Sequence, residues 1–251
     1  MNIIKKIKNS LRVRNEMNDI KQIRYVVLDH LRELIKRRKG IDDNLFEITA
    51  FLLDEIGDSL ASIIKLREDH LKSSIMIARF ILEDSVNLQY IYKADSEKRA
   101  LNYRAFSAKG LLKRMEQSKE EDERIKGEIP RVKERVDKYS PSGNNPGHWD
   151  GRSVKDIMSD LGLDNIYSNW YMRMSSYIHP QYHGHKITAD VDSPYINFLK
   201  DMVFKDLAMP ILESLKVINE KLDLLEGGVI FRDYPKKKST LIFSINNKRM
   251  K

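Results

Sequence analysis

Hydrophobic residues recur every three or four positions over most of this 251-residue chain, which is the spacing that gives an α-helix one buried face. This pattern predicts helices over about 44–68, 70–93, 96–139, 164–178 and 194–225, with a short helix after Ser153. The first two predicted helices are long and nearly consecutive, so we expect them to pair antiparallel. The fold class predicted is therefore all-α, an antiparallel helical bundle.

Both ends of the chain differ from this bundle in composition. Residues 1–39 hold twelve Lys or Arg against four acids, with helical spacing of their apolar residues, and predict a basic amphipathic helix. That helix either packs on the bundle or forms a basic arm that touches RNA or a membrane surface. Residues 227–251 form a basic tail that includes a candidate short strand at 241–245. We therefore divide the chain into 1–39, a bundle over 40–226, and this small appendage.

Turn-forming residues predict where several helices begin and end. Gly40 followed by Asp42 and Asp43 predicts a stop and a new helix start, and Ser153 with Asp156 fits a capping box. Residues 127–130, Gly-Glu-Ile-Pro, predict a break in the helix over 96–139, which would form a projecting hairpin. The stretch 140–147 is rich in Ser, Pro, Gly and Asn and predicts a loop.

Charge and composition narrow the classes of function. The net charge is +8 and the pI about 9.4, which permits binding to nucleic acid or another polyanion. The chain has no cysteine, so disulfides, thiolate metal sites and a cysteine nucleophile are excluded. No apolar run reaches the roughly 18 residues that a transmembrane helix needs, and no secretory signal is recognisable, so we expect a cytoplasmic protein.

The densest group of chemically active side chains lies within residues 171–185. Arg173 and His179 are separated by five residues, an R-x5-H pattern that combines a phosphate-binding guanidinium with an imidazole that titrates near neutral pH. Further polar candidates in the same stretch are Ser176, Tyr177, His183 and His185. Pro180 disfavours helical geometry at the preceding residue, so the helix should end near His179.

A second set of polar residues lies inside the predicted helix over 70–93. Arg79, Glu83 and Asn87 recur every four residues and therefore share one face. Two interpretations remain open. Either an Arg79–Glu83 ion pair fixes the packing of this helix, or these side chains line the same pocket as Arg173 and His179.

These stretches, together with His148-Trp-Asp-Gly-Arg-Ser153, resemble an uncharacterised bacterial family related to the HEPN superfamily. The resemblance covers about residues 45–225 and implies a HEPN-like helical bundle. It also implies a metal-independent endoribonuclease without a cofactor, a homodimer, and a role in phage defence or a toxin-like system with an operon-encoded protein partner. Arg173 and His179 would be catalytic on RNA, leaving 2′,3′-cyclic phosphate and 5′-hydroxyl ends, although Met174 replaces the Asn, Asp or His of many active relatives.

Other interpretations of the same residues compete with catalysis. The chain would then be a catalytically inert helical module that binds RNA, a nucleotide or a protein. In that case Arg173 would pair with Glu83, and His179 would favour a helix C-terminus through the dipole. His179, His183 and His185 also have the spacing H-x3-H-x-H, which could ligate zinc, although a loop holds three ligands poorly.

Overall fold

The computed structural model describes residues 3–66, 70–118, 123–139, 151–178 and 194–224, and these residues are helical with short connections. The α-helices are α1 (Ile3–Lys36), α2 (Asp43–Leu66), α3 (Leu71–Lys93), α4 (Ser96–Ser118), α5 (Glu123–Tyr139), α6 (Val154–Asp160), α7 (Asp164–Ile166), α8 (Met172–Ile178), α10 (Pro194–Asp201) and α11 (Ala208–Leu222). Two π-helical segments, η2 (Tyr167–Tyr171) and η3 (Met202–Asp206), interrupt the later helices. The described part of the chain contains no strand, so the all-α prediction is confirmed. The candidate strand at 241–245 lies outside the described residues.

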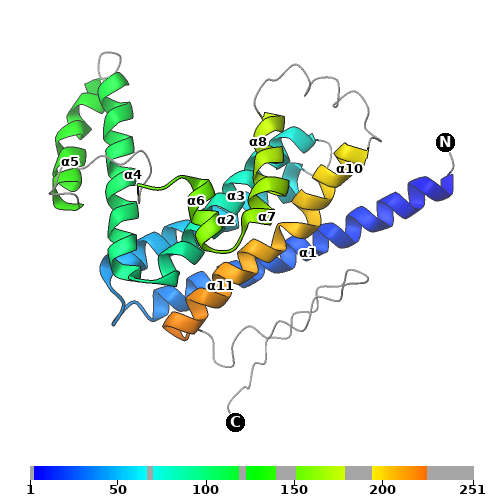
Figure 1. Ribbon diagram of the computed structural model, residues 1–251, viewed down its shortest axis with the longest axis horizontal. Helices are drawn as coiled ribbons and strands as arrows, with labels where there is room; N and C mark the ends of the chain where they lie inside the picture. The colour runs from blue at the N-terminus through cyan, green and yellow to red at the C-terminus, as the bar shows by residue number, and fades with distance from the viewer. Residues whose placement is uncertain (1–2, 67–69, 119–122, 140–150, 179–193, 225–251) are drawn as a thin grey trace, which may run out of the picture.

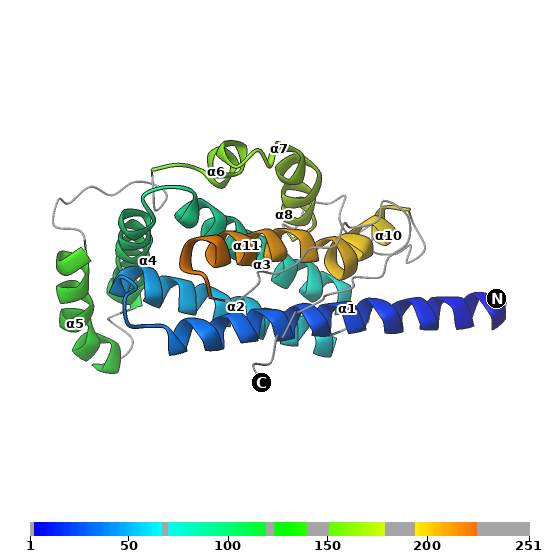
Figure 2. The same cartoon turned by 90° about the horizontal axis from the view of Figure 1, so that it is seen from below.

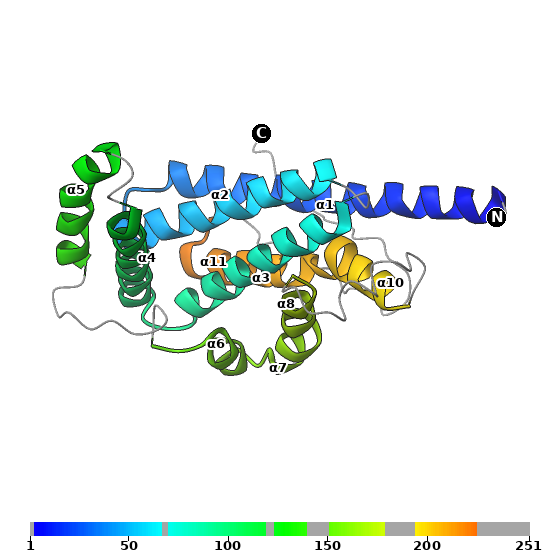
Figure 3. The same cartoon turned by 90° about the horizontal axis from the view of Figure 1, so that it is seen from above.

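Four long helices enclose the core. The pairs α1–α2, α2–α3, α3–α11 and α11–α1 are all in contact, so the four form a closed ring around the buried side chains. Figures 2 and 3 show the two faces of this ring, with α1 and α11 in front in the first view and α2 and α3 in the second. The helices α2 and α3 run antiparallel as predicted. The helix α1 is antiparallel to α2, and α11 runs the same way as α3 (Figure 3).

The core is built from the hydrophobic positions that carry the helical periodicity. Val27 and Leu34 of α1 are fully buried, so the second half of this basic helix belongs to the same core as the rest of the bundle. Other fully buried residues in the same cluster come from α2, α3 and α11, among them Leu52, Ile56, Ile81, Leu82, Ile211 and Leu215. Burial of these side chains supplies the main favourable term in folding.

Helix starts follow the predicted local signals. Gly40, in the connection between α1 and α2, adopts φ +103°, a conformation that side chains disfavour. The Asp42 carboxylate then accepts hydrogen bonds from the backbone N–H groups of Asn44 and Leu45, each across 2.9 Å, and caps α2. Ser153 and Asp156 make both bonds of the predicted capping box at α6.

A helical hairpin formed by α4 and α5 stands out from the bundle (Figure 1). The sequence predicted such a hairpin with its break at residues 127–130, and that position is wrong. The helix α4 ends at Ser118, and α5 starts at Glu123 and continues through Pro130. Pro130 removes one backbone donor from α5 without ending it.

Candidate functional site

A polar cluster joins α3 to the segment that contains η2 and α8. The Arg79 guanidinium donates to Ser175 Oγ across 3.1 Å and to the Tyr171 hydroxyl across 2.6 Å, and it pairs with Glu83 at 2.8 Å. Tyr171 in turn donates to Glu83 Oε1 across 2.7 Å. We call Arg79, Glu83, Tyr171 and Ser175 the α3–α8 cluster. All its charged and polar groups have partners, as partly buried polar groups require.

A π-helical segment places two members of this cluster. In η2 the Met172 backbone N–H bonds to the carbonyl of Tyr167, five residues earlier, instead of four as in an α-helix. The extra residue rotates the following turn relative to the preceding α-helix. Tyr171 and Ser175 then face Arg79, and the Tyr167 ring stacks on the Tyr171 ring at 5.4 Å between centroids.

Three carboxylates crowd the neighbouring face of α3. The pKa of Asp84 is raised to about 7, chiefly by burial and to a smaller extent by the nearby charges of Glu83 and Glu55. Burial also raises the pKa of Tyr103, a residue of α4 whose hydroxyl is close to these acids and hydrogen-bonds Asn87. A carboxyl group that titrates near neutral pH is suited to proton transfer, although crowding alone also produces such a shift.

A partly open pocket of about 230 Å³ lies between α3 and α6. Its lining residues are Glu83, Val86, Asn87, Val154 and Ile157. Two members of the predicted polar ladder, Glu83 and Asn87, therefore share a pocket. Arg79, the third member, does not line it but holds Glu83 from the side of Tyr171.

Arg173 lies apart from the α3–α8 cluster. Its side chain is exposed, and its guanidinium carbon lies 4.8 Å from the ring centroid of Phe198 on α10. Positions 171 and 175 face α3, whereas a residue two positions along a helix points about 160° away. The structure therefore pairs Arg79 with Glu83, which is the first of the two interpretations left open by the sequence. It places Arg173 with neither of them.

The remaining candidates of residues 171–185 are described only in part. The Ser176 hydroxyl is exposed and donates to the Arg173 carbonyl across 2.9 Å. Tyr177 belongs to α8, which ends at Ile178, but its side chain lies outside the described part. His179, His183 and His185 also lie outside it, and the described segments contain no group of His, Cys, Asp or Glu suited to a metal ion.

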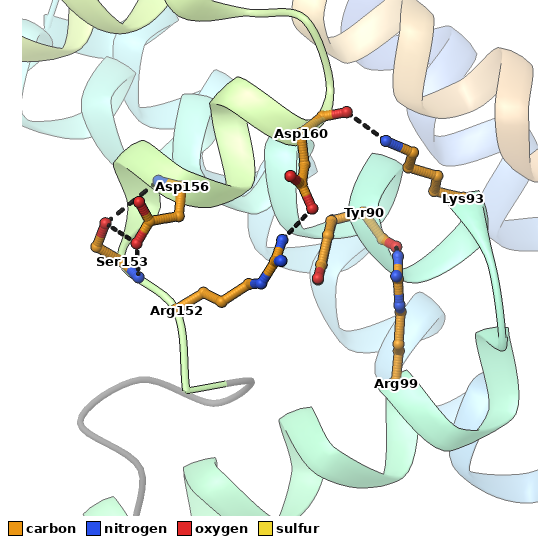
Figure 4. Close-up of polar contacts among 7 residues, drawn as sticks. All are labelled: Tyr90, Lys93, Arg99, Arg152, Ser153, Asp156 and Asp160. Carbon is orange, nitrogen blue, oxygen red and sulfur yellow. Dashed lines mark hydrogen bonds and ion pairs between the residues drawn. The ribbon is translucent and has the colours of Figure 1, made fainter.

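Both ends of α6 are held to the end of α3 by a second polar network (Figure 4). Arg152 pairs with Asp160, and Lys93 donates to the backbone carbonyl of Asp160. Arg152 also interacts with the side chain of the buried Tyr90, and Arg99 donates to the Tyr90 carbonyl while its guanidinium lies 3.9 Å from that ring's centroid. This network holds α6 over α3, where the two helices line the pocket.

Sequence reasoning missed Tyr171 and Ser175 as partners of the polar ladder. Their spacing of four residues is visible in the sequence, but neither was among the predicted site residues. The signal was the spacing itself. A tyrosine and a serine one turn apart share one face of their helix, and that face can supply hydroxyl partners to an Arg–Glu pair on a neighbouring helix. Both residues lie within the stretch that was singled out.

Comparison with known proteins gives a family but no described activity. No curated protein and no solved structure matched the chain. A family model described as a family of unknown function, DUF5677, matches residues 46–192, which run from α2 past α8 and include the whole α3–α8 cluster and the network at α6. This match covers more than half of the chain, and the protein therefore belongs to the DUF5677 family.

Proposed function

We propose that this protein is a metal-independent endoribonuclease of HEPN type, with Arg173 and His179 acting on the RNA phosphodiester. The observation that carries the proposal is the state of Arg173. Its guanidinium is exposed and, within the described part of the chain, has a flat aromatic neighbour, Phe198, but no hydrogen bond or ion pair. Such a guanidinium can bind a phosphate bidentately without first losing another partner.

The chemistry needs only the two side chains and the ribose. The 2′-hydroxyl attacks the adjacent phosphorus, and the imidazole of His179 moves the proton as general base or acid, as its usual pKa near 6.5 permits. Arg173 stabilises the charge that develops on the phosphoryl oxygens. The P–O5′ bond breaks and the leaving oxygen is protonated, so the products are a 2′,3′-cyclic phosphate and a 5′-hydroxyl.

Helix geometry makes a second copy of the chain part of this proposal. Positions 173 and 179 would differ by about 120° in direction and about 9 Å in rise on a straight α-helix. A homodimer that brings Arg173 of one copy to His179 of another removes that difficulty. A role in phage defence or a toxin-like system, with an operon-encoded partner, completes the proposal and rests on the resemblance to HEPN proteins. The cytoplasmic localisation proposed with it rests on the apolar pattern of the sequence.

The test is cleavage of end-labelled RNA by the purified chain in EDTA. We expect cleavage with the wild-type protein, and loss of at least about 100-fold in rate for Arg173→Ala and for His179→Ala. Arg135→Ala, which removes another exposed arginine on the distant α5, is the matched control and should cleave as the wild type does. Cleavage that persists in both site variants, or that disappears in EDTA, would contradict the proposal.

A catalytically inert binding module is the second candidate, and Met174 is the observation that favours it. Many active HEPN relatives carry a polar residue at this position, whereas the Met174 side chain is fully buried in the core. In addition, Arg79 and Glu83 satisfy each other and their neighbours on α8, as a structural pair would. RNA that stays intact but is retained by the wild-type protein, and not by Arg173→Ala, would assign this function instead.

A further inference from the structure

The pocket between α3 and α6 combines apolar walls with one charged side chain. Its apolar walls are Val86 of α3 with Val154 and Ile157 of α6, and its volume is about 230 Å³. Glu83 and Asn87, one turn apart on the same face of α3, supply its polar side. We call these five residues the α3–α6 pocket. Among these described lining residues there is no lysine, arginine or histidine, so Glu83 sets the sign of the charge inside.

The Glu83 carboxylate is held in place from outside the pocket. Its Oε1 atom accepts a hydrogen bond from the Tyr171 hydroxyl across 2.7 Å and pairs with the Arg79 guanidinium at 2.8 Å. A carboxylate has about four acceptor sites, and these two contacts use two of them. The Glu83 side chain is 22% exposed, so its carboxylate can also accept hydrogen bonds from a ligand that enters the pocket.

The wall formed by α6 is fixed as well. Val154 is the first residue of this helix and directly follows the capping box of Ser153 with Asp156. At the other end of the helix, the backbone carbonyl of Asp160 accepts a hydrogen bond from Lys93 of α3. Figure 4 shows these contacts at the two ends of α6. A ligand that binds between walls already held in this way loses little free energy to ordering them.

The size and the charge of the pocket together define a class of ligand. Pockets for drug-sized ligands usually enclose about 300–1,000 Å³, so this smaller pocket fits a head group with a short body. A phosphate or carboxylate would be repelled by Glu83, because apolar surroundings strengthen the interaction between charges. A cation with several N–H donors is favoured, since charge-assisted hydrogen bonds to a carboxylate are strong. An amidinium or guanidinium offers such donors in one plane.

We propose that the α3–α6 pocket binds a small organic cation, an amidinium or guanidinium group that donates to Glu83, with an apolar body between Val86, Val154 and Ile157. A free small molecule and an arginine side chain of a partner protein present the same group. The proposal does not depend on RNA cleavage, because Arg173 does not line the pocket and a phosphate does not suit it.

Benzamidine is the probe, because it joins an amidinium to a short apolar ring. Ligand-observed saturation-transfer NMR with the full chain should show binding with a Kd on the order of 1–10 mM, as expected for so small a ligand. Benzamide, its neutral isostere, should bind at least about tenfold more weakly, and benzoate should not bind. N-acetylarginine N-methylamide is the second arm. Tighter binding than benzamidine would identify a partner's arginine as the source of the group, and weaker binding a free small molecule.

Two variants and two controls locate the binding. Glu83→Gln keeps the shape of the side chain and removes its charge, so it should weaken benzamidine binding at least about tenfold. Val154→Phe fills the pocket from a half-buried position and should abolish binding. Glu47→Gln removes a carboxylate that pairs with Arg104 outside the pocket, and Lys155→Ala removes an exposed neighbour of Val154. Both controls should bind benzamidine as the wild type does.

Three results would overturn the proposal. Benzamidine binding that is unchanged in Glu83→Gln or in Val154→Phe, with circular dichroism showing that both variants are folded, would place the cation outside the pocket. Tighter binding of benzamide or benzoate than of benzamidine would contradict the charge assigned to the ligand. A wild-type protein that shows no saturation transfer to either cation, at ten times the expected Kd, would exclude this class of ligand.

Discussion

Tyr171 donates a hydrogen bond to Glu83 across 2.7 Å, although 88 residues separate them in the chain. The same hydroxyl accepts from Arg79. Burial and the Glu83 charge raise the pKa of Tyr171, so the phenol stays protonated and remains a donor at neutral pH. This bond fixes the segment that carries Arg173 against α3.

Removal of the Tyr171 hydroxyl tests that role. Tyr171→Phe keeps the ring and leaves Arg79 and Glu83 paired with each other, so we expect a loss of about 1–2 kcal/mol in the free energy of unfolding. Urea denaturation followed by circular dichroism measures it. Tyr167→Phe, in the ring stacked on Tyr171, is the control and should cost less than about 0.5 kcal/mol. Equal losses in the two variants would contradict the role of the hydroxyl.

The Arg79–Glu83 pair should be worth more than a surface ion pair. Its side chains are 23% and 22% exposed, whereas those of the comparable Arg32–Asp29 pair are 66% and 42% exposed. Arg79→Ala leaves a half-buried carboxylate without its cation, so we expect a loss of about 2–3 kcal/mol. Arg32→Ala should cost less than about 1 kcal/mol. Urea denaturation compares the two variants. Similar losses in the free energy of unfolding for Arg79→Ala and Arg32→Ala would show that the Glu83 carboxylate is solvated well enough to need no cation.

Arg173 should behave in the opposite way. Its guanidinium is exposed and lies over Phe198, so Arg173→Ala should change the free energy of unfolding by less than about 1 kcal/mol. A residue that contributes little to stability yet abolishes RNA binding or cleavage is one that acts on a ligand. A loss of stability as large as that of Arg79→Ala would instead place Arg173 among the packing residues and remove the main support for the proposed site.

Local signals in the sequence predicted local structure well. The caps at Asp42 and Ser153 were predictable because each carboxylate or hydroxyl bonds backbone groups two or three residues away. The Arg79–Glu83 pair was an open interpretation for the same reason, since its members are one helical turn apart. The all-α class followed from the periodicity of the hydrophobic positions.

Features that depend on distant packing were not predictable. The helix expected over 164–178 contains the π-helical η2, and the helix expected over 194–225 contains η3. Neither segment has a proline or a glycine to mark it, so tertiary contacts decide the register there. The contact of Tyr171 with Arg79 depends on this register and was not predicted. Pro130, which was expected to mark a break, lies inside α5.

Asp84 predicts an unusual dependence of stability on pH. Burial and the charges of Glu83 and Glu55 raise its pKa to about 7, against an ordinary value near 3.8, and Tyr103 of α4 also faces this group. The folded chain therefore binds a proton between about pH 4 and 7 that the unfolded chain has lost. The stability that the fold gains from binding this proton is fully present below about pH 4 and is lost as the pH rises through 7.

Asp84→Asn removes this titration and keeps the shape of the side chain. Relative to wild type, the variant should gain up to about 1 kcal/mol of stability per pH unit between pH 4 and 7, and about 2 kcal/mol in total because the carboxylate is partly solvated. Burial lowers the pKa of His30, which makes the wild-type protein less stable as the pH falls, but both proteins share this effect and it cancels in the difference. Urea denaturation at pH 5, 6, 7 and 8 measures that difference. A constant difference across this range would mean that Asp84 is ionised throughout and that the neighbouring acids are already neutralised by a cation.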